Sequence, residues 1–226
     1  MERQNASTYD RLLNAAARLF AQKGYDGTTT REIVKEADSS LSSFQTHFQS
    51  KETVYKEAVD RAMVRYYDMF KPCLEEVDLL EQRGMLHGEM AWNLLAQLIS
   101  THAEWAFMEE ERDTILLMNR EMLDAQPMMN TVPEAALAIM ATIQKLCEAY
   151  VGASDTTWGK MLGHTIVMSL FGYANYPRVL SQIMDMDVTL PENALLLKML
   201  GKGYILISLR AYLDFQKNED LNFSRS

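Results

Sequence analysis

The chain has 226 residues, of which 48% are hydrophobic, and its formal net charge is −9 at pH 7. This length is sufficient for a sizeable buried core, and no apolar run approaches the roughly 18 residues of a transmembrane helix. The polar start of the sequence contains no apolar signal-peptide region, so we expect a soluble cytoplasmic protein that does not associate with membranes. Cys73 and Cys147 match no metal-binding spacing and are expected to be buried free thiols.

The negative charge is unevenly distributed. Residues 1–51 hold seven Lys and Arg against six Asp and Glu, whereas residues 52–226 hold fifteen against twenty-five. The acidity therefore belongs to the C-terminal part, where it favours solubility and repels nucleic acid. Because the N-terminal part is only weakly basic, any contact with DNA there depends on the placement of individual groups.

The first predicted helix begins near Ser7, ends at Gly24 and has one apolar side. A second, short helix follows, because the hydroxyl of Thr28 or Thr29 can accept a free backbone N–H at a helix start. Its apolar side contains Ile33, Val34 and Ala37, which occur at helical spacing.

The helical pattern breaks at Asp38-Ser39-Ser40, residue types that favour turns and helix caps. A third helix is predicted from Leu41 to Phe48, with Phe44 and Phe48 on its inner side and polar residues on the other. Two short helices joined by a tight turn have the layout of a helix-turn-helix motif, whose second helix enters the DNA major groove. This stretch alone fits an ordinary helical hairpin equally well.

A fourth helix is predicted from the N-cap Ser50 to about Lys71, ending before Pro72. With this helix included, AAARLFAQKGYDGTTTREIVKEAD and SSLSSFQTHFQSKETVYKEAV resemble the DNA-binding domain of the TetR family of transcriptional regulators. The resemblance covers about residues 9–60, and several spaced features occur in the expected order.

The resemblance implies three groups of residues at the DNA. Those near the DNA backbone are Thr28, Thr29, Thr30 and Arg31; those on the reading helix are Ser40, Leu41, Ser42, Ser43, Gln45, Thr46 and His47; and Lys51 is expected to meet a phosphate. Chemically, the Gln45 amide suits adenine, and hydroxyl groups suit several base edges. His47 has an alternative interpretation, as a partly buried hydrogen-bonding residue on the inner edge of the helix.

From residue 73 onward the pattern is helical, without strand-like alternation. The acidic run Glu109-Glu110-Glu111 is interpreted as a solvated helix start, and the segment from Gln126 to Asn130 as a loop. Two further helix starts are expected at Thr131, paired with Glu134, and at Asp155.

Two long segments, residues 158–184 and 191–216, are apolar around most of their circumference. A helix of this kind must be covered on more than one side. We therefore expect a homodimer through these two helices, which also fits the four-helix dimer interface of the resembled family. Packing within one subunit is the alternative.

Methionine is concentrated in residues 85–140, and such flexible, polarisable side chains can adapt to varied apolar ligands. In the resembled family this region holds an effector pocket. The residues predicted to bind a small molecule are Trp92, Trp105, Met118, Met122, Tyr150 and Met168. An ordinary Met-rich core is the alternative for each of them.

No catalytic motif is present, and the four histidines are scattered, so we expect no enzyme, no metal and no cofactor. The predicted fold is all-α, with a three-helix helix-turn-helix DNA-binding domain in residues 1–51 and a larger effector-binding and dimerisation domain in residues 52–226. The predicted function is a ligand-responsive repressor, released from a palindromic DNA operator by a small apolar or aromatic effector.

This chain departs from the resembled family in having Asp38 at the turn, Ser39 in place of an apolar residue, Gln45 in place of tyrosine, and no Lys or Arg on the reading helix. These departures motivate the alternative function, a helical small-molecule-binding or protein-interaction module with a degenerate DNA-reading face. A steep dependence of DNA affinity on salt would distinguish a true operator binder from such a module.

Overall fold

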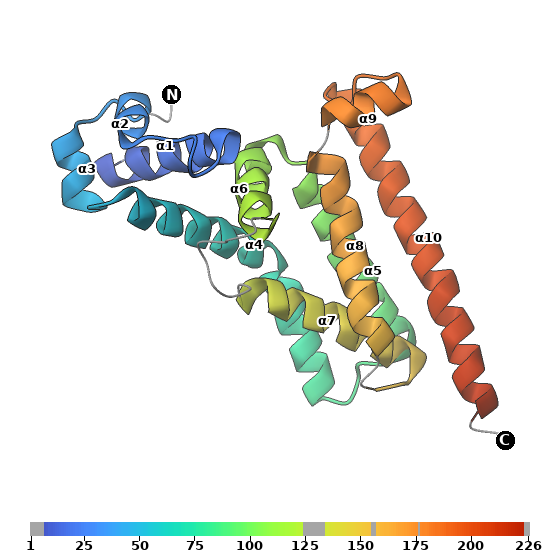
Figure 1. Ribbon diagram of the computed structural model, residues 1–226. Coiled ribbons are helices and arrows are strands. Elements are labelled where there is room, and N and C mark those ends of the chain that lie inside the picture. Colours follow the sequence, from blue (N-terminus) through green and yellow to red (C-terminus); the bar gives the residue numbers. More distant parts are fainter. Residues whose placement is uncertain (1–6, 124–133, 155–156, 176, 224–226) are drawn as a thin grey trace. The chain divides into compact units, whose positions relative to one another are not determined.

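The computed structural model describes residues 7–123, 134–154, 157–175 and 177–223, and every regular element in these ranges is a helix (Figure 1). The all-α prediction is therefore confirmed. Along the same ranges, no helix has both the length and the low polarity that crossing a membrane requires. The chain divides into two compact units, Met1–Tyr66 with Glu110–Pro133, and Tyr67–Glu109 with Glu134–Ser226.

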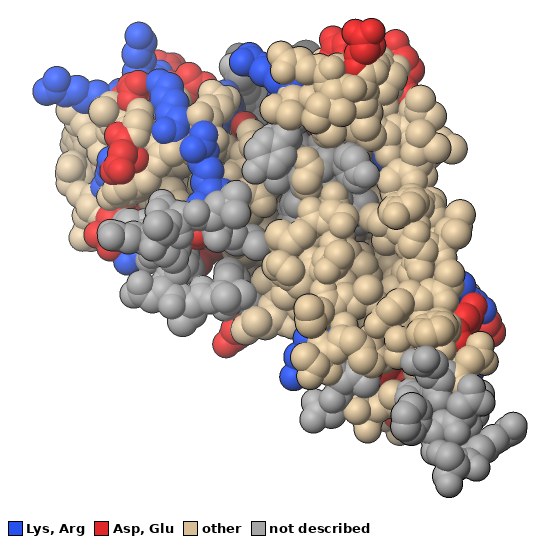
Figure 2. All heavy atoms as spheres, turned by 45° about the vertical axis from the view of Figure 1, so that its right-hand side comes forward, with Lys and Arg blue, Asp and Glu red and all other residues tan. Residues whose placement is uncertain are grey.

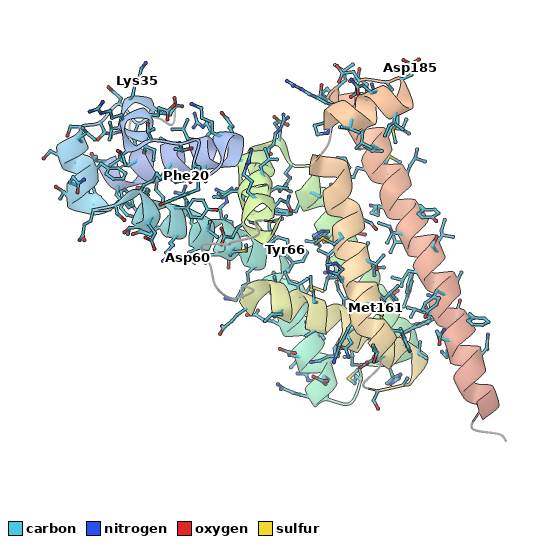
Figure 3. The ribbon with its side chains drawn as sticks, viewed as in Figure 1. Phe20, Lys35, Asp60, Tyr66, Met161 and Asp185 are labelled. Atoms are coloured by element: carbon cyan, nitrogen blue, oxygen red, sulfur yellow. The ribbon has the colours of Figure 1, made fainter. Side chains whose placement is uncertain are left out.

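The first unit contains α1 (Thr8–Lys23), α2 (Thr30–Glu36), α3 (Leu41–His47), the first part of α4 (Lys51–Gln82), and α6 (Arg112–Leu123). Helix α1 packs against α2, α3 and α6. Phe20 is fully buried between α1 and α4 (Figure 3), where its ring centroid lies 4.9 Å from that of Tyr55. The other fully buried side chains of this core include Leu12, Ile33, Phe44, Phe48 and Val54.

Helix α6 is distant in sequence from the helix-turn-helix yet belongs to the same unit. The Arg120 guanidinium donates hydrogen bonds to the carbonyl oxygens of Ala21 at 2.7 Å and Gln22 at 3.0 Å. These carbonyls lie in the last turn of α1, where a helix leaves backbone acceptors without an intrahelical partner. The compact units do not test the predicted boundary between residues 51 and 52, because that boundary separates a DNA-binding part from an effector-binding part by function. It stays a prediction.

Helix α4 continues through Pro72, whereas the sequence analysis predicted that it would end before this residue. Proline lacks the backbone N–H that would bond the carbonyl four residues earlier, which here belongs to Asp68. Asp68 is exposed, so water can reach this carbonyl instead. On the opposite side, the buried residues Phe70, Cys73 and Val77 continue one apolar stripe. Packing along this stripe holds the helix together where the local rule predicts a stop.

The second unit contains the rest of α4, α5 (Gly88–Ala106), α7 (Glu134–Val151), α8 (Thr157–Asn175), α9 (Pro177–Met184) and α10 (Pro191–Phe223). Helix α5 packs against α7, α8 and α10. The single helix predicted over residues 158–184 is therefore wrong, because α9 begins separately at Pro177. A proline suits the first turn of a helix, where its missing N–H would have no partner anyway.

Helix α10 extends to Phe223, beyond the predicted end at residue 216. The predicted loop from Gln126 to Asn130 and the predicted helix caps at Thr131 and Asp155 lie outside the described residues. Both cysteines are free and buried, as predicted. Burial raises the pKa of the Cys73 thiol to about 11 and that of Cys147 to about 12.

The acidic run is a short 3-10 helix, Glu109–Glu111, and its last residue contradicts the prediction of a solvated segment. Glu111 is buried, with 9% of its surface exposed, and its carboxylate forms an ion pair with Arg65 of α4. A buried carboxylate needs such a partner because desolvation of an unpaired charge is costly. The acidic run itself could not indicate that Glu111 is buried, because its partner Arg65 lies 46 positions away in the sequence.

Candidate nucleic-acid interface

The start of α2 is fixed by a capping box between Thr29 and Glu32. The Thr29 hydroxyl accepts a hydrogen bond from the Glu32 N–H at 3.2 Å, and the Glu32 carboxylate accepts one from the Thr29 N–H at 2.9 Å. A hydrogen bond from the Lys23 ammonium is the largest of the effects that lower the pKa of Glu32 to about 2. Thr29 is thus the residue that sets where α2 begins.

The turn between α2 and α3 depends on Asp38, whose φ of 46° lies in the left-handed region. The N–H of Ser39 donates to the carbonyl of Val34 at 2.9 Å, which closes the end of α2. Arg11 of α1 donates from its Nε to the carbonyl of Ala37 at 3.3 Å. Aspartate tolerates a left-handed backbone better than most residues, as expected from the sequence, so the turn forms without a glycine.

Ser40 is the N-cap of α3, and its hydroxyl accepts the N–H of Ser43 at 3.1 Å. The hydroxyls of Ser40 and Ser43 lie 3.0 Å apart, and that of Thr46 donates to the carbonyl of Ser42 at 3.0 Å. Leu41, Ser42 and Gln45 are exposed. Ser40 and Thr46 are exposed as well, but the hydroxyls of Ser40, Ser43 and Thr46 already have hydrogen-bond partners within the helix.

His47 lies at the end of α3 against the aromatic residues of α1 and the helix cap. Its ring centroid is 6.0 Å from that of Tyr9, in an edge-on arrangement, and 6.2 Å from that of Phe48. Tyr9 in turn stacks on Phe48 at 5.1 Å and donates to the Glu57 carboxylate at 2.6 Å. The His47 side chain is nevertheless exposed, so part of its ring meets solvent.

Two of the residues predicted at DNA have internal roles in this structure. The Thr28 side chain is fully buried, and its hydroxyl donates to the carbonyl of Gly24 at 2.8 Å. The Lys51 ammonium lies 4.0 Å from the centre of the Tyr25 ring and donates to the carbonyls of Tyr25 at 3.0 Å and Thr28 at 3.2 Å. Lys51 thus ties the start of α4 to the loop that precedes α2.

The exposed positive charge next to the motif lies on α2 instead. Arg31 and Lys35 are exposed there, and Lys35 points outward from the helix (Figure 3). Both glutamates of α2 are neutralised by cations of α1, Glu32 by Lys23 at 2.7 Å and Glu36 by Arg18 at 2.8 Å. Thr30 is half-buried beside Arg31. The sequence analysis included Arg31 but missed Lys35, which follows it by one helical turn.

The six residues predicted to bind an effector are divided between the two compact units. Met118 and Met122 lie on α6 in the first unit, whereas Trp92, Trp105, Tyr150 and Met168 lie in the second. Trp105 is fully buried beside His102, with ring centroids 6.2 Å apart, and Met168 is half-buried on α8. Trp92 and Trp105 are thirteen residues apart on one helix, or about 20 Å.

Trp92 of α5 and Tyr150 of α7 are the pair that the structure brings together, with ring centroids 6.0 Å apart. The Arg210 guanidinium of α10 lies 4.8 Å from the Trp92 ring and 4.9 Å from the Tyr150 ring. Arg210 also pairs with Glu89, and the Tyr150 hydroxyl donates to Asp214. The faces of these rings thus already pack against a cation that the sequence analysis did not single out.

A third feature is an uncharged surface on the second unit. Helix α10 exposes Leu196, Leu200, Tyr204 and Ile207, which follow one another at three- or four-residue spacing along one stripe. Met161 of α8 and Ile183 of α9 are also largely exposed. Figure 2 shows a broad area without Lys, Arg, Asp or Glu over α8 and α10. Exposed apolar side chains gathered on one surface are typical of interaction sites.

Comparison with known proteins agrees with the helix-turn-helix geometry. Residues 12–58 match the family model described as bacterial regulatory proteins, tetR family. The chain is 40% identical over 50 residues to the biofilm operon icaADBC HTH-type negative transcriptional regulator IcaR of Staphylococcus aureus strain Newman, which is 22% of this chain and 27% of that regulator. For IcaR of Staphylococcus epidermidis, the match is 34% over 59 residues, 26% of this chain and 32% of that one.

Solved structures resemble the fold over most of the chain. The transcriptional regulator FadR from Bacillus subtilis, in complex with stearoyl-CoA, superposes with a TM-score of 0.61 at 13% identity, over 88% of this chain and 97% of its own. GusR of Salmonella enterica gives a TM-score of 0.60 at 18% identity, over 93% and 97%. A TerR/AcrR-family transcriptional regulator of Aquifex aeolicus VF5 gives 0.56 at 20% identity, over 91% and 99%.

Proposed function

We propose that this chain, which belongs to the TetR family of bacterial regulatory proteins through its N-terminal helices, is a dimeric repressor that a small molecule releases from DNA. Transcription regulation and DNA binding follow from the family match over residues 12–58 and from the negative regulator that the chain resembles over 50 residues. The palindromic operator, the effector and the dimer are parts of the proposal.

The observation that carries the proposal is the outward face of α3 together with the charge beside it. The hydrogen bonds of Ser40 and Thr46 hold the helix, and the packing of Phe44 and Phe48 fixes it to the unit. On its outer surface, Leu41, Ser42 and Gln45 are exposed. Such a helix suits the major groove, and Arg31 and Lys35 supply cations for flanking phosphates.

The uncharged surface of α8, α9 and α10 supports the dimer. A second copy of the chain could cover the stripe of Leu196, Leu200, Tyr204 and Ile207 with the same stripe of its own, as a two-fold interface requires. Two reading helices would then contact half-sites about one DNA turn apart. Dimerisation also doubles the number of phosphate contacts, which matters for a weakly basic DNA-binding domain.

An apolar or aromatic effector is proposed for the larger unit. The similarly folded FadR of Bacillus subtilis was solved with stearoyl-CoA, a ligand with a long apolar chain. Within the second unit of this chain, Trp92, Trp105, Tyr150 and Met168 are candidate contacts. Met118 and Met122, the other two residues of the predicted set, lie on α6 in the first unit. An effector that binds one of two spacings of the reading helices more tightly shifts the population toward that spacing.

The test is footprinting of the purified protein on its own promoter region at two salt concentrations, with coding-sequence DNA of the same length as the control. We expect a protected, nearly symmetric site whose affinity falls steeply with salt, because each neutralised phosphate contributes a slope of about −0.9. Equal, unlocalised binding to promoter and control DNA would overturn the proposed repressor. It would favour the alternative of a module with a degenerate reading face.

A further inference from the structure

Three outward side chains on α3 share one face of the helix. Leu41 and Gln45 are four residues apart, and Ser42 and Gln45 are three apart, so the three lie side by side on the helix surface. All three are exposed, and 46% of the Leu41 surface meets solvent. We call Leu41, Ser42 and Gln45 the reading triad.

The other polar side chains of α3 are less available for bases. Ser40 and Ser43 bond each other and the helix start, and the Thr46 hydroxyl donates its proton to the carbonyl of Ser42. His47 packs one side of its ring against Tyr9 and Phe48. The reading triad therefore carries most of the free recognition chemistry of the helix.

The reading triad combines an apolar aliphatic side chain, a hydroxyl and an amide, and none of the three is charged. In the major groove, an apolar side chain distinguishes thymine by its C5-methyl group, and a Gln amide pairs with N6 and N7 of adenine. Guanine is most often read by the bidentate donors of Arg or by Lys. Residues 36–50 contain neither Lys nor Arg.

The cations nearest to α3 in the sequence do not lie on its outer surface. The Lys51 ammonium is turned inward to the carbonyls of Tyr25 and Thr28, and Arg31 and Lys35 lie on α2, the helix that crosses the backbone in this motif. The exposed Leu41 at the start of α3 also gains free energy only when an apolar partner covers it. A thymine methyl is the apolar group that the major groove offers.

We infer that the reading triad recognises A·T base pairs: Leu41 contacts a thymine methyl, and Gln45 bonds the edge of an adenine in the same half-site. This inference rests on the proposed operator binding and specifies its chemistry. Ser42, between the two, can bond either kind of base edge and adds little discrimination.

The test uses synthetic duplexes of the footprinted site in which single thymines are replaced by deoxyuridine, which lacks the methyl, or single adenines by 7-deazaadenine, which lacks the N7 acceptor. We expect deoxyuridine at one position of each half-site to weaken binding about fourfold, as for one buried methyl or methylene. We expect 7-deazaadenine at another position to weaken it by roughly tenfold, as for a lost bidentate contact.

Variants assign these effects to residues. Leu41→Ala should bind the thymine and deoxyuridine duplexes equally, and Gln45→Ala should bind the adenine and 7-deazaadenine duplexes equally. Asn14→Ala, at an exposed position on α1, should retain both differences. Circular dichroism and the salt slope of each variant show whether the domain is folded and still meets phosphates.

Two results would overturn the inference, and they differ from failure of the proposed function. A footprinted site that is insensitive to every deoxyuridine and 7-deazaadenine substitution would show that α3 reads other features. Differences that persist unchanged in Leu41→Ala and Gln45→Ala would place the readout on other residues. In both cases the salt-sensitive footprint itself would still stand, whereas its absence would overturn the repressor.

Discussion

The hydroxyl of Tyr55 on α4 donates a hydrogen bond of 2.7 Å to the carboxylate of Glu121 on α6, and both side chains are buried. This bond joins residues 66 positions apart in the chain. It ties α6 to the helix that follows the reading motif, next to the bonds from Arg120 to the end of α1. A ligand that displaced α6 would therefore act directly on the unit that contains α3.

Replacing Tyr55 by Phe should lower the free energy of unfolding by about 1–3 kcal/mol, because the buried Glu121 carboxylate loses a donor that water cannot replace. Urea denaturation followed by circular dichroism measures this loss. The matched control is Tyr9→Phe, which removes an exposed hydrogen bond to Glu57 and should cost less than about 1 kcal/mol. Equal losses for the two variants would contradict the stabilising role of the buried bond.

His102 should make the second unit sensitive to mild acid. Burial lowers its pKa to about 4, against a hydrogen bond involving the Val167 backbone that raises it. The unfolded chain takes up a proton near pH 6.5 that the folded chain does not take up until about pH 4, so stability falls as the pH falls across this window. The full effect is on the order of 3 kcal/mol, at about 1.4 kcal/mol for each pH unit.

Urea denaturation at several pH values and one protein concentration checks this expectation. His102→Gln keeps a donor at this position but does not titrate, so its stability should vary less between pH 6.5 and pH 4 than that of the parent. The control is His87→Gln, which alters an exposed residue without a side-chain capping bond and should keep the parental pH dependence. Parallel pH profiles for all three proteins would exclude His102 as the source.

The turn between α2 and α3 predicts opposite effects for two substitutions of Asp38. Its φ of 46° suits glycine, so Asp38→Gly should change stability by less than about 1 kcal/mol, and in the favourable direction. Asp38→Ala should destabilise by about 1–2 kcal/mol, because a Cβ is strained in the left-handed region. Thermal denaturation measures both. Asp26→Ala, at an exposed position outside that region, should have little effect, and an equal loss there would contradict the explanation.

The helix-turn-helix was predictable because its signals are local. Thr29 and Glu32 cap one helix, Ser40 caps the next, and the apolar side of each is complete within seven residues. The prediction that α4 ends before Pro72 failed for the opposite reason. The buried stripe that continues past Pro72 includes Phe70, which contacts His102, and Cys73, which bonds the Leu94 carbonyl.

Long-range contacts explain the rest. The bonds of Arg120 to α1 span 98 and 99 residues, so no window of sequence reveals that α6 belongs with the first unit. The same limit applies to the predicted effector residues, which stay a prediction. Composition and residue type selected Trp92 and Met118 together, but only packing could reveal that they lie in different compact units, and that a cation already packs against Trp92.

Arg31 should contribute to DNA binding through charge alone. If its guanidinium meets one phosphate in each half-site, Arg31→Ala should weaken binding similarly for all sequences and reduce the salt slope by about 2 per dimer, since each phosphate contact contributes about 0.9. Fluorescence anisotropy with the operator at several salt concentrations measures the slope. Lys71→Ala, which removes an exposed cation of α4, is the control and should leave the slope unchanged. An unaltered slope for Arg31→Ala would place this side chain away from DNA.

The uncharged surface of α10 gives the last prediction. Ile207 is 74% exposed in the single chain, the largest exposed fraction on the stripe, so Ile207→Glu should leave each protomer folded. If the stripe pairs with a second copy, the new carboxylate must be desolvated opposite its own equivalent, which costs several kcal/mol. Sedimentation equilibrium should then show a shift from dimer to monomer, and footprints should require higher protein concentrations.

Val64→Glu is the matched control for this interface, because Val64 is 58% exposed on α4 and lies outside the stripe. We expect this variant to remain a dimer with parental helix content. A dimer that survives Ile207→Glu but dissociates in Val64→Glu would place the interface on the other unit. Recognition of a two-fold operator requires both α3 helices in one particle, so the footprint of Ile207→Glu should weaken. Its position should not change, because the substitution leaves α3 unaltered.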